Sequence, residues 1–279
     1  MVNELFSALI LAIVQGITEW LPISSSGHLV LFESLLNYNG GLAFGVALHF
    51  GTLMAVFVYF GRDITEIIKD VFTGRWNTEY GKMGVLIAVA SIPAAIVGFL
   101  VKDVFESVLS NLGIVALGFG ITGLFLFIAS LDLTHPPNPK KTKLISKSNS
   151  VIDNNEMRKL GYGKAFLVGI AQALSIVPGI SRSGATISSG VLLGLGEKSA
   201  MKFAFLMSIP IIFGANIISI GNETLPSELI WATLVSFIVG LLFIHLVFKY
   251  LLVKRKNFRW FAVYCLLLAA GIGIYLLVL

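Results

Sequence analysis

The chain has 279 residues, of which 56% are hydrophobic and 13% are charged, and its mean hydropathy is +0.90. Soluble domains carry about a quarter charged residues, so this composition excludes a soluble globular protein and indicates an integral membrane protein. The net charge of +5 does not indicate a nucleic-acid partner, because the basic residues lie between apolar segments, where membrane topology explains them. The single cysteine, Cys265, excludes a disulfide framework.

Two apolar stretches are interrupted by polar motifs and predict helical hairpins. The first covers residues 5–36 and is broken between Trp20 and His28, and the second covers 165–195 and is broken between Pro178 and Thr186. Proline ends a helix, and serine caps the next one. We expect each hairpin to dip into the membrane and return. Irregular backbone at that depth is tolerated only where protein buries it or where it lines a wet cavity.

Six further segments are long and apolar enough to cross about 30 Å of hydrocarbon as helices. They are residues 42–60, 83–101, 112–131, 203–220, 229–248 and 260–279. The predicted fold is an all-α polytopic membrane protein with six transmembrane helices and two re-entrant hairpins. The strongly polar residues 132–164 predict a flexible cytoplasmic connector between two halves, 1–131 and 165–279, each with a hairpin followed by three spans.

The distribution of lysine and arginine predicts the orientation. The linkers 61–82, 132–164, 196–202 and 249–259 hold 4, 7, 2 and 5 of these residues, whereas the segments on the other face hold only Lys102. Basic loops stay in the cytoplasm. The two sets alternate correctly only if both hairpins are re-entrant, the first from outside and the second from inside. We therefore expect a multi-pass membrane protein with both termini outside.

The two hairpins also resemble each other in sequence. A shift of 157 residues aligns six positions: Gln15 with Gln172, Thr18 with Ser175, Ile23 with Ile180, Ser24 with Ser181, Ser26 with Ser183, and Gly27 with Gly184. Together with the opposite directions of entry, this predicts an inverted-topology repeat. In such folds the interrupted helices of the two halves meet near the membrane midplane and form a binding site there.

Arg182 is the only lysine or arginine inside an apolar hairpin. A cation at that depth costs several kcal/mol, so it needs an acidic partner or an anionic ligand. Glu19, at the end of the first apolar helix, is the candidate partner. Gln15 and Glu19 are four residues apart and project from one helix face, and they could together hold a divalent cation such as Mg²⁺ or Ca²⁺. His28 could act as an acid or a base.

Hydroxyl groups dominate both interruptions. Both loops precede a helix, so their hydroxyls and free backbone N–H groups could bind an oxyanion, and Arg182 adds a planar cationic fork suited to phosphate. The candidate phosphate-binding residues are Gln15, Ser24, Ser26, Gly179, Ser181, Ser183 and Thr186. The candidate catalytic residues are Glu19, Ser25, His28 and Arg182. The residues alone predict a membrane site for a phosphorylated ligand.

Two motifs resemble those of a known family. Residues 15–19 fit the (E/Q)xxxE motif of the bacitracin-resistance (BacA-type) undecaprenyl-diphosphate phosphatases, and residues 21–28 continue it as that family does. Residues 178–186 fit the second family motif, PGxSRSxxT, at every fixed position. The resemblance covers the whole chain, including the order of the spans. Gln15 is an allowed variant, although it weakens the case for a charged metal ligand at that position.

The resemblance implies hydrolysis of undecaprenyl diphosphate, the lipid carrier of cell-wall synthesis, to the monophosphate and inorganic phosphate. It also implies a location in the bacterial inner membrane, bacitracin resistance, a need for Mg²⁺ or Ca²⁺, and a site that opens to the outer face. It implies roles in the active site for six residues of this chain: Glu19, Ser25, His28, Ser181, Arg182 and Thr186. Either Ser25 or a water could attack the terminal phosphorus, with His28 or Glu19 as the base. An oligomer is compatible with the sequence but is not indicated by it.

Several alternatives remain open. A polyprenyl-phosphate flippase or secondary transporter could use the same inverted repeat, although binding alone does not require Glu19, His28 and so many serines. A phosphatidic-acid-type phosphatase is less compatible, because position 25 is serine rather than proline and position 188 is not histidine. Glu19 and Arg182 could also form a purely structural ion pair. We interpret His49 and His245, which lie in ordinary spans, as structural residues.

Overall fold

A computed structural model describes residues 4–101, 111–131, 160–219 and 228–278. All regular secondary structure in these ranges is helical, so the predicted all-α class is confirmed. Most of the predicted connector, residues 132–159, lies outside the described residues.

Both predicted hairpins are present as pairs of short helices. The first consists of α1 (Glu4–Thr18) and α2 (Ser25–Leu36), and the second of α10 (Tyr162–Leu174) and α11 (Arg182–Leu192). Ser24 and Ser181 cap the second helix of each pair, because their hydroxyls accept hydrogen bonds from the backbone N–H groups of Gly27 and Gly184. The helices therefore break at the predicted motifs. Whether the hairpins re-enter a membrane stays a prediction.

Six longer helices within the described residues are apolar and long enough to cross a membrane, as predicted. They are α3 (Gly41–Tyr59), α5 (Glu79–Val101), α7 (Leu112–Ser130), α12 (Glu197–Ser219), α13 (Glu228–Leu246) and α14 (Phe258–Val278). A π-helical turn, η2 (Val247–Leu251), and a 3-10 turn, η3 (Arg255–Asn257), connect α13 to α14. The protein is thus a multi-pass membrane protein.

Helix α4 (Gly61–Phe72) was not predicted from the sequence. It occupies the first part of the basic segment 61–82, which we interpreted only as a linker. Its apolar residues Ile64, Ile67 and Val71 recur at helical spacing, and this pattern is typical of an amphipathic helix. Asp63 in α4 forms an ion pair with the buried Lys202 of α12 at 2.5 Å, so α4 is held against the helical bundle.

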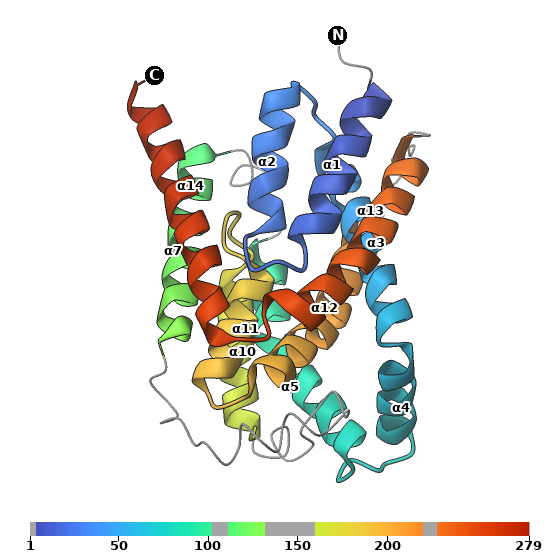
Figure 1. The fold of residues 1–279 in the computed structure, drawn as a ribbon. Coiled ribbons are helices and arrows are strands. Elements are labelled where there is room, and N and C mark those ends of the chain that lie inside the picture. The colour runs from blue at the N-terminus through green and yellow to red at the C-terminus, as the bar shows by residue number, and fades with distance from the viewer. Residues whose placement is uncertain (1–3, 102–110, 132–159, 220–227, 279) are drawn as a thin grey trace.

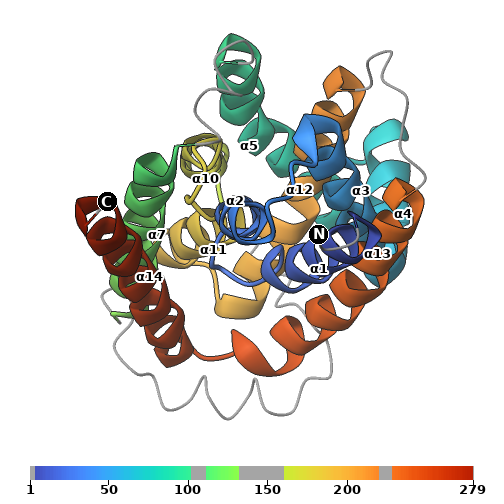
Figure 2. The ribbon, with the colours of Figure 1, turned by 90° about the horizontal axis from the view of Figure 1, so that it is seen from above.

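The two hairpins approach each other from opposite ends of the molecule. Figure 1 shows α1 and α2 at the end where α14 finishes, with their connecting loop directed toward the centre, and α10 and α11 in the other half with their loop directed back toward it. Seen along the perpendicular direction, α2 and α11 lie near the middle, with α7 and α14 on one side and α3 and α13 on the other (Figure 2).

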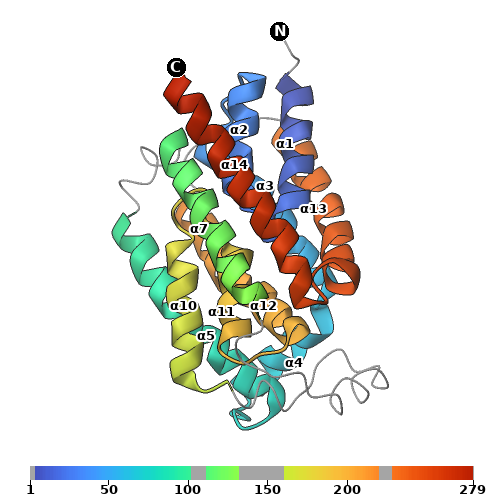
Figure 3. The same cartoon turned by 60° about the vertical axis from the view of Figure 1, so that its left-hand side comes forward.

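The packing partners of the hairpins are arranged in the same way in both halves. Helix α1 packs along α13, and α10 packs along α5, while α7 and α14 run side by side (Figure 3). An inverted repeat would pair these helices in this manner, because α1 corresponds to α10 and α5 to α13. This arrangement is compatible with the predicted inverted repeat, which stays a prediction.

Candidate functional site

A largely buried ion pair joins the two hairpins. Glu19 follows the last residue of α1, and Arg182 is the first residue of α11. The Arg182 Nη2 atom donates to Glu19 Oε1, and the two side chains are only 14% and 3% exposed. Glu19 is thus the acidic partner that the sequence predicted for Arg182. Removing one member of such a buried pair costs about 3–5 kcal/mol, because the other charge is left without compensation.

The second carboxylate oxygen of Glu19 collects further polar groups. Gln15 Nε2 donates to Oε2 at 2.9 Å, and Ser25 Oγ donates to the same oxygen at 2.6 Å. The predicted common face of Gln15 and Glu19 is therefore present, and Ser25 joins it from the start of α2. Because the Ser25 hydroxyl already donates to this carboxylate, the carboxylate is placed to accept the serine proton.

His49 also reaches this carboxylate, which the sequence interpretation did not foresee. Its Nε2 atom lies 3.5 Å from Glu19 Oε2, and its Nδ1 atom lies 2.8 Å from the carbonyl oxygen of Gly45. A carbonyl oxygen only accepts hydrogen bonds, so Nδ1 carries a proton and Nε2 faces Glu19. We interpreted His49 as structural because it lies in an ordinary apolar span. Only the packing of α3 against the first hairpin loop reveals the contact.

His28 has both ring nitrogens occupied. Nδ1 lies 2.7 Å from the carbonyl oxygen of Ser24, and Nε2 lies 2.7 Å from the hydroxyl of Tyr264 in α14. The residue is 5% exposed, and its ring packs edge to face against Phe119. No contact described in the structure joins His28 directly to Glu19 or Ser25. The predicted residues thus form two adjoining networks rather than one.

The remaining predicted hydroxyls are bonded within the protein. Ser183 Oγ donates to the carbonyl oxygen of Leu21 at 2.9 Å, which ties the second loop to the first. Thr186 Oγ1 donates to the carbonyl oxygen of Arg182 at 2.7 Å. The hydroxyls of Ser24 and Ser181, besides capping their helices, lie 3.3 Å and 3.2 Å from those of Ser26 and Ser183, respectively. Phosphate binding by these residues stays a prediction.

Helix α7 holds the second loop in position. Thr122 Oγ1 donates to the carbonyl oxygen of Gly179 at 3.0 Å and accepts from the backbone N–H of Ser181 at 2.8 Å. Gly179 has φ +89°, and a Cβ atom at this position would lie 2.2 Å from the carbonyl oxygen of Val115. Only glycine fits there. The structure thus gives Gly179 a packing role, and Thr122 is a support that the sequence analysis did not identify.

Within the described residues, buried side-chain polar atoms without a hydrogen-bond partner are confined to the two hairpins. They are Gln15 Oε1, Trp20 Nε1, both amide atoms of Gln172, Arg182 Nη1 and Ser188 Oγ. Buried polar groups normally have partners, so unpaired ones indicate a place for a ligand or water. Gln15 Oε1 and Arg182 Nη1 belong to side chains that both contact Glu19. The side chains around Glu19 therefore include one buried acceptor and one buried cationic donor that have no hydrogen-bond partner.

The oxygen atoms around Glu19 could supply some, but not all, of the ligands of a divalent cation such as Mg²⁺. Among the residues described, no group of three or more histidine, cysteine, aspartate or glutamate residues is placed to hold a metal. However, Mg²⁺ often uses one carboxylate together with the phosphate oxygens of its substrate. The Glu19 carboxylate, the unpaired Gln15 Oε1 and the Ser25 hydroxyl supply oxygen ligands of the required type.

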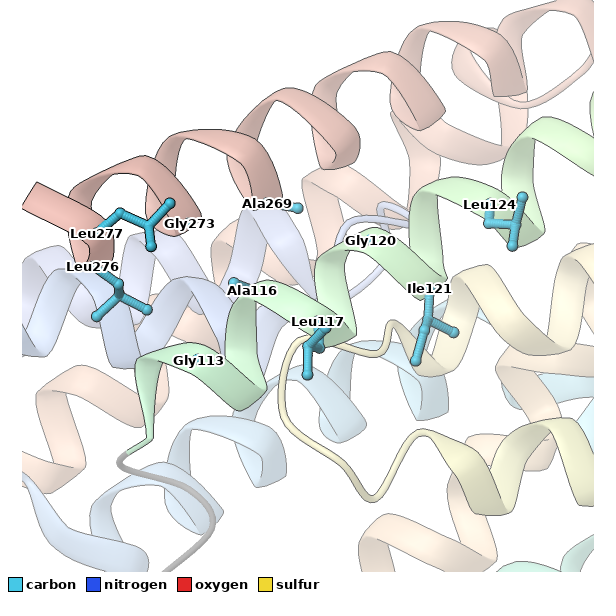
Figure 4. Close-up of a pocket in the computed structure, with 10 residues that line it drawn as sticks. All are labelled: Gly113, Ala116, Leu117, Gly120, Ile121, Leu124, Ala269, Gly273, Leu276 and Leu277. Carbon is cyan, nitrogen blue, oxygen red and sulfur yellow. The ribbon is translucent and has the colours of Figure 1, made fainter.

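A separate apolar groove lies between α7 and α14, with a volume of about 530 Å³. Figure 4 shows its lining residues, which are Gly113, Ala116, Leu117, Gly120, Ile121, Leu124, Ala269, Gly273, Leu276 and Leu277. None of them is a predicted site residue. The polar centre, by which we mean Glu19 and the side chains that contact it, is therefore distinct from this groove.

The sequence is similar to a described protein family and to several named proteins. Residues 8–271 match the sequence model of the family described as "Bacitracin resistance protein BacA". The chain is 38% identical to the undecaprenyl-diphosphatase of Thermosipho melanesiensis over 94% of this chain and 95% of the relative. It is 35% identical to the protein of that name from Methanococcus vannielii, over 96% and 99%. A third, from Halothermothrix orenii, is 37% identical over 99% and 98%.

Proposed function

The chain belongs to the BacA bacitracin-resistance family, and from this premise we propose that it is a phosphatase that converts undecaprenyl diphosphate into undecaprenyl phosphate and inorganic phosphate. The observation that carries the proposal is the largely buried Arg182, which uses Nη2 to bind Glu19 and leaves Nη1 unpaired between the two hairpins. An arginine with a free buried donor is suited to a phosphate oxygen. Relatives named undecaprenyl-diphosphatase support the lipid diphosphate as substrate.

The proposed location is the bacterial plasma membrane, with both termini outside and the polar centre open to the outer face. The support is the asymmetry of the basic linkers. In the structure, α1 begins and α14 ends at the same end of the molecule, and α4 with its lysine and arginine residues lies at the other (Figure 1). The apolar tail of the substrate would stay in the lipid while its diphosphate reaches the hairpin loops.

In the proposed reaction, Arg182 and the backbone N–H groups at the start of α11 hold the terminal phosphate. Ser25 Oγ already donates to Glu19 at 2.6 Å, so Glu19 is placed to take its proton. The Ser25 oxygen then bonds to the terminal phosphorus, and the bridging P–O bond breaks to release undecaprenyl phosphate. A water would next cleave the phosphoserine and release inorganic phosphate. This geometry favours Glu19 over His28 as the group that accepts the serine proton.

Direct attack by water is the alternative route. In that case Ser25 would orient the substrate, and Glu19 would take a proton from the water instead. Trapping a phosphorylated Ser25 after rapid acid quenching supports the serine route. A Ser25→Ala variant with the wild-type rate excludes it.

A divalent cation is part of the proposal. Glu19 and Gln15 would hold it, and its chemistry would be to neutralise the charge of the diphosphate oxygens. The protein's own contribution is positional, because phosphoryl transfer depends mainly on orientation and charge stabilisation. Recycling of the lipid carrier for cell-wall synthesis, and with it bacitracin resistance, would follow from this activity.

Release of inorganic phosphate by the purified protein tests the proposal. The protein in detergent, with Mg²⁺ or Ca²⁺, is incubated with undecaprenyl diphosphate, and phosphate and lipid monophosphate are measured together. Equal molar release of both products is expected. Absence of release, combined with transfer of undecaprenyl phosphate across vesicles that contain the protein, would contradict the proposal and support a flippase.

A further inference from the structure

The contacts of His28 define which of its nitrogens is basic. Nδ1 lies 2.7 Å from the carbonyl oxygen of Ser24. Because a carbonyl oxygen cannot donate, this contact requires a proton on Nδ1. In the neutral ring Nε2 therefore has no proton and presents its lone pair. Nε2 is the only nitrogen of His28 that can gain a proton in the reaction.

Nε2 is covered by a side chain from the last helix. The hydroxyl of Tyr264 lies 2.7 Å from Nε2, and the two rings are nearly parallel, with 6° between their planes. The neighbouring Cys265 is buried, and its Sγ lies 3.9 Å from the carbonyl oxygen of Pro22 in the first loop. Helix α14 thus contacts the first hairpin at two successive residues, because Tyr264 reaches His28 in α2 and Cys265 reaches Pro22 in the loop. Tyr264 itself is 43% exposed, so only its hydroxyl end reaches His28.

From this geometry we propose that Tyr264 is a positioning residue that holds His28 for catalysis. A tyrosine hydroxyl is both a donor and an acceptor. It donates to the lone pair of neutral Nε2, and after His28 gains a proton it accepts from Nε2–H. Tyr264 therefore keeps the imidazole in one orientation in both protonation states. The inference rests on the proposed phosphatase activity, in which Glu19 takes the proton of Ser25. It adds a proton exchange at His28 as a separate step, and it adds α14 to the elements that build the site.

The kinetic test uses Tyr264→Phe, which removes the hydroxyl and keeps the ring. Loss of one such hydrogen bond predicts a fall in kcat of about two- to tenfold, with little change in KM, because Tyr264 acts through His28. Tyr275→Phe is the matched control, since Tyr275 is an exposed tyrosine of the same helix. In a His28→Ala background, which is expected to be slower by about a hundredfold or more, Tyr264→Phe should cause no further loss.

Each result decides a separate question. A wild-type kcat for Tyr264→Phe, a rise in KM alone, or an equal further loss in the His28→Ala background would overturn the role of Tyr264. A wild-type protein that releases no phosphate would instead overturn the proposed function.

A second measurement is independent of activity. In ¹⁵N-histidine-labelled protein, with four histidines to assign, His28 should be the Nδ1–H tautomer with a hydrogen-bonded Nε2.

The nuclear magnetic resonance signal of His28 Nε2 should shift in Tyr264→Phe and stay unchanged in Tyr275→Phe. If Tyr264→Phe does not fold, the wild-type spectrum still decides the question, because an Nε2–H tautomer of His28 would contradict the proposed arrangement.

Discussion

Replacement of Arg182 by lysine separates its two tasks. A lysine at position 182 keeps the positive charge beside Glu19, so the buried ion pair survives. The three donors of an ammonium group are all on one nitrogen, so a lysine that pairs with Glu19 cannot also place a donor where Nη1, unpaired in the structure, lies. One hydrogen bond to a charged group contributes about 1.5–3 kcal/mol. At about 1.36 kcal/mol for each factor of ten in rate, kcat/KM for the lipid diphosphate should fall about 12- to 160-fold.

The matched control is Arg255→Lys. Arg255 also pairs with a glutamate, Glu197, and its side chain has the same 14% exposure as that of Arg182, but it lies in η3, away from the hairpin loops. Phosphate release and the apparent melting temperature in detergent are measured for both variants. We expect both to keep the melting temperature and only Arg182→Lys to lose activity. Wild-type kcat/KM for Arg182→Lys would refute the reasoning that Nη1 binds phosphate.

Three further predictions follow from the structure. Ser25→Ala should lower kcat by about a hundredfold or more if Ser25 is the nucleophile, whereas Ser26→Ala should stay within tenfold of wild type; equal effects in the phosphate-release assay would contradict this. Removal of divalent cations with EDTA should abolish phosphate release, and added Mg²⁺ or Ca²⁺ should restore it; full activity in the chelator would exclude the cation. Gly179→Ala should lower the apparent melting temperature more than Gly41→Ala. Both glycines have positive φ, where an alanine costs about 1–2 kcal/mol, but only the alanine at position 179 would also clash with Val115. Equal shifts of the melting temperature would contradict the packing role of Gly179.

The six spans and the two hairpins could be predicted from the sequence, because hydropathy marks the spans and helix-breaking residues mark the hairpin loops. The six spans follow from the length of the apolar segments, because a membrane imposes a minimum length on each helix. The hairpin breaks follow from Pro22 and Pro178, and Ser24 and Ser181 cap the helices after them. The Glu19–Arg182 pair was predictable by elimination, since each charge is isolated within an apolar stretch and needs a partner.

The supports of the site could not be predicted in the same way. His49, Thr122 and Tyr264 lie in ordinary apolar spans, and nothing in their local sequence distinguishes them from packing residues. Each reaches the hairpins only through contacts between segments that are distant in the chain. Helix α4 differs from these residues, because the helical spacing of its apolar side chains is visible in the sequence of the basic segment 61–82.

The central claim is that the two hairpin loops form one site that acts as a unit. A cycle of kcat/KM values for Ser25→Ala, Arg182→Lys and the double variant tests it most directly, with radiolabelled undecaprenyl diphosphate as the substrate. Residues that act together give non-additive effects. Because Ser25 and Arg182 bind opposite oxygens of the same Glu19 carboxylate, the double variant should be little slower than the worse single variant. Rate losses that simply multiply would contradict the claim.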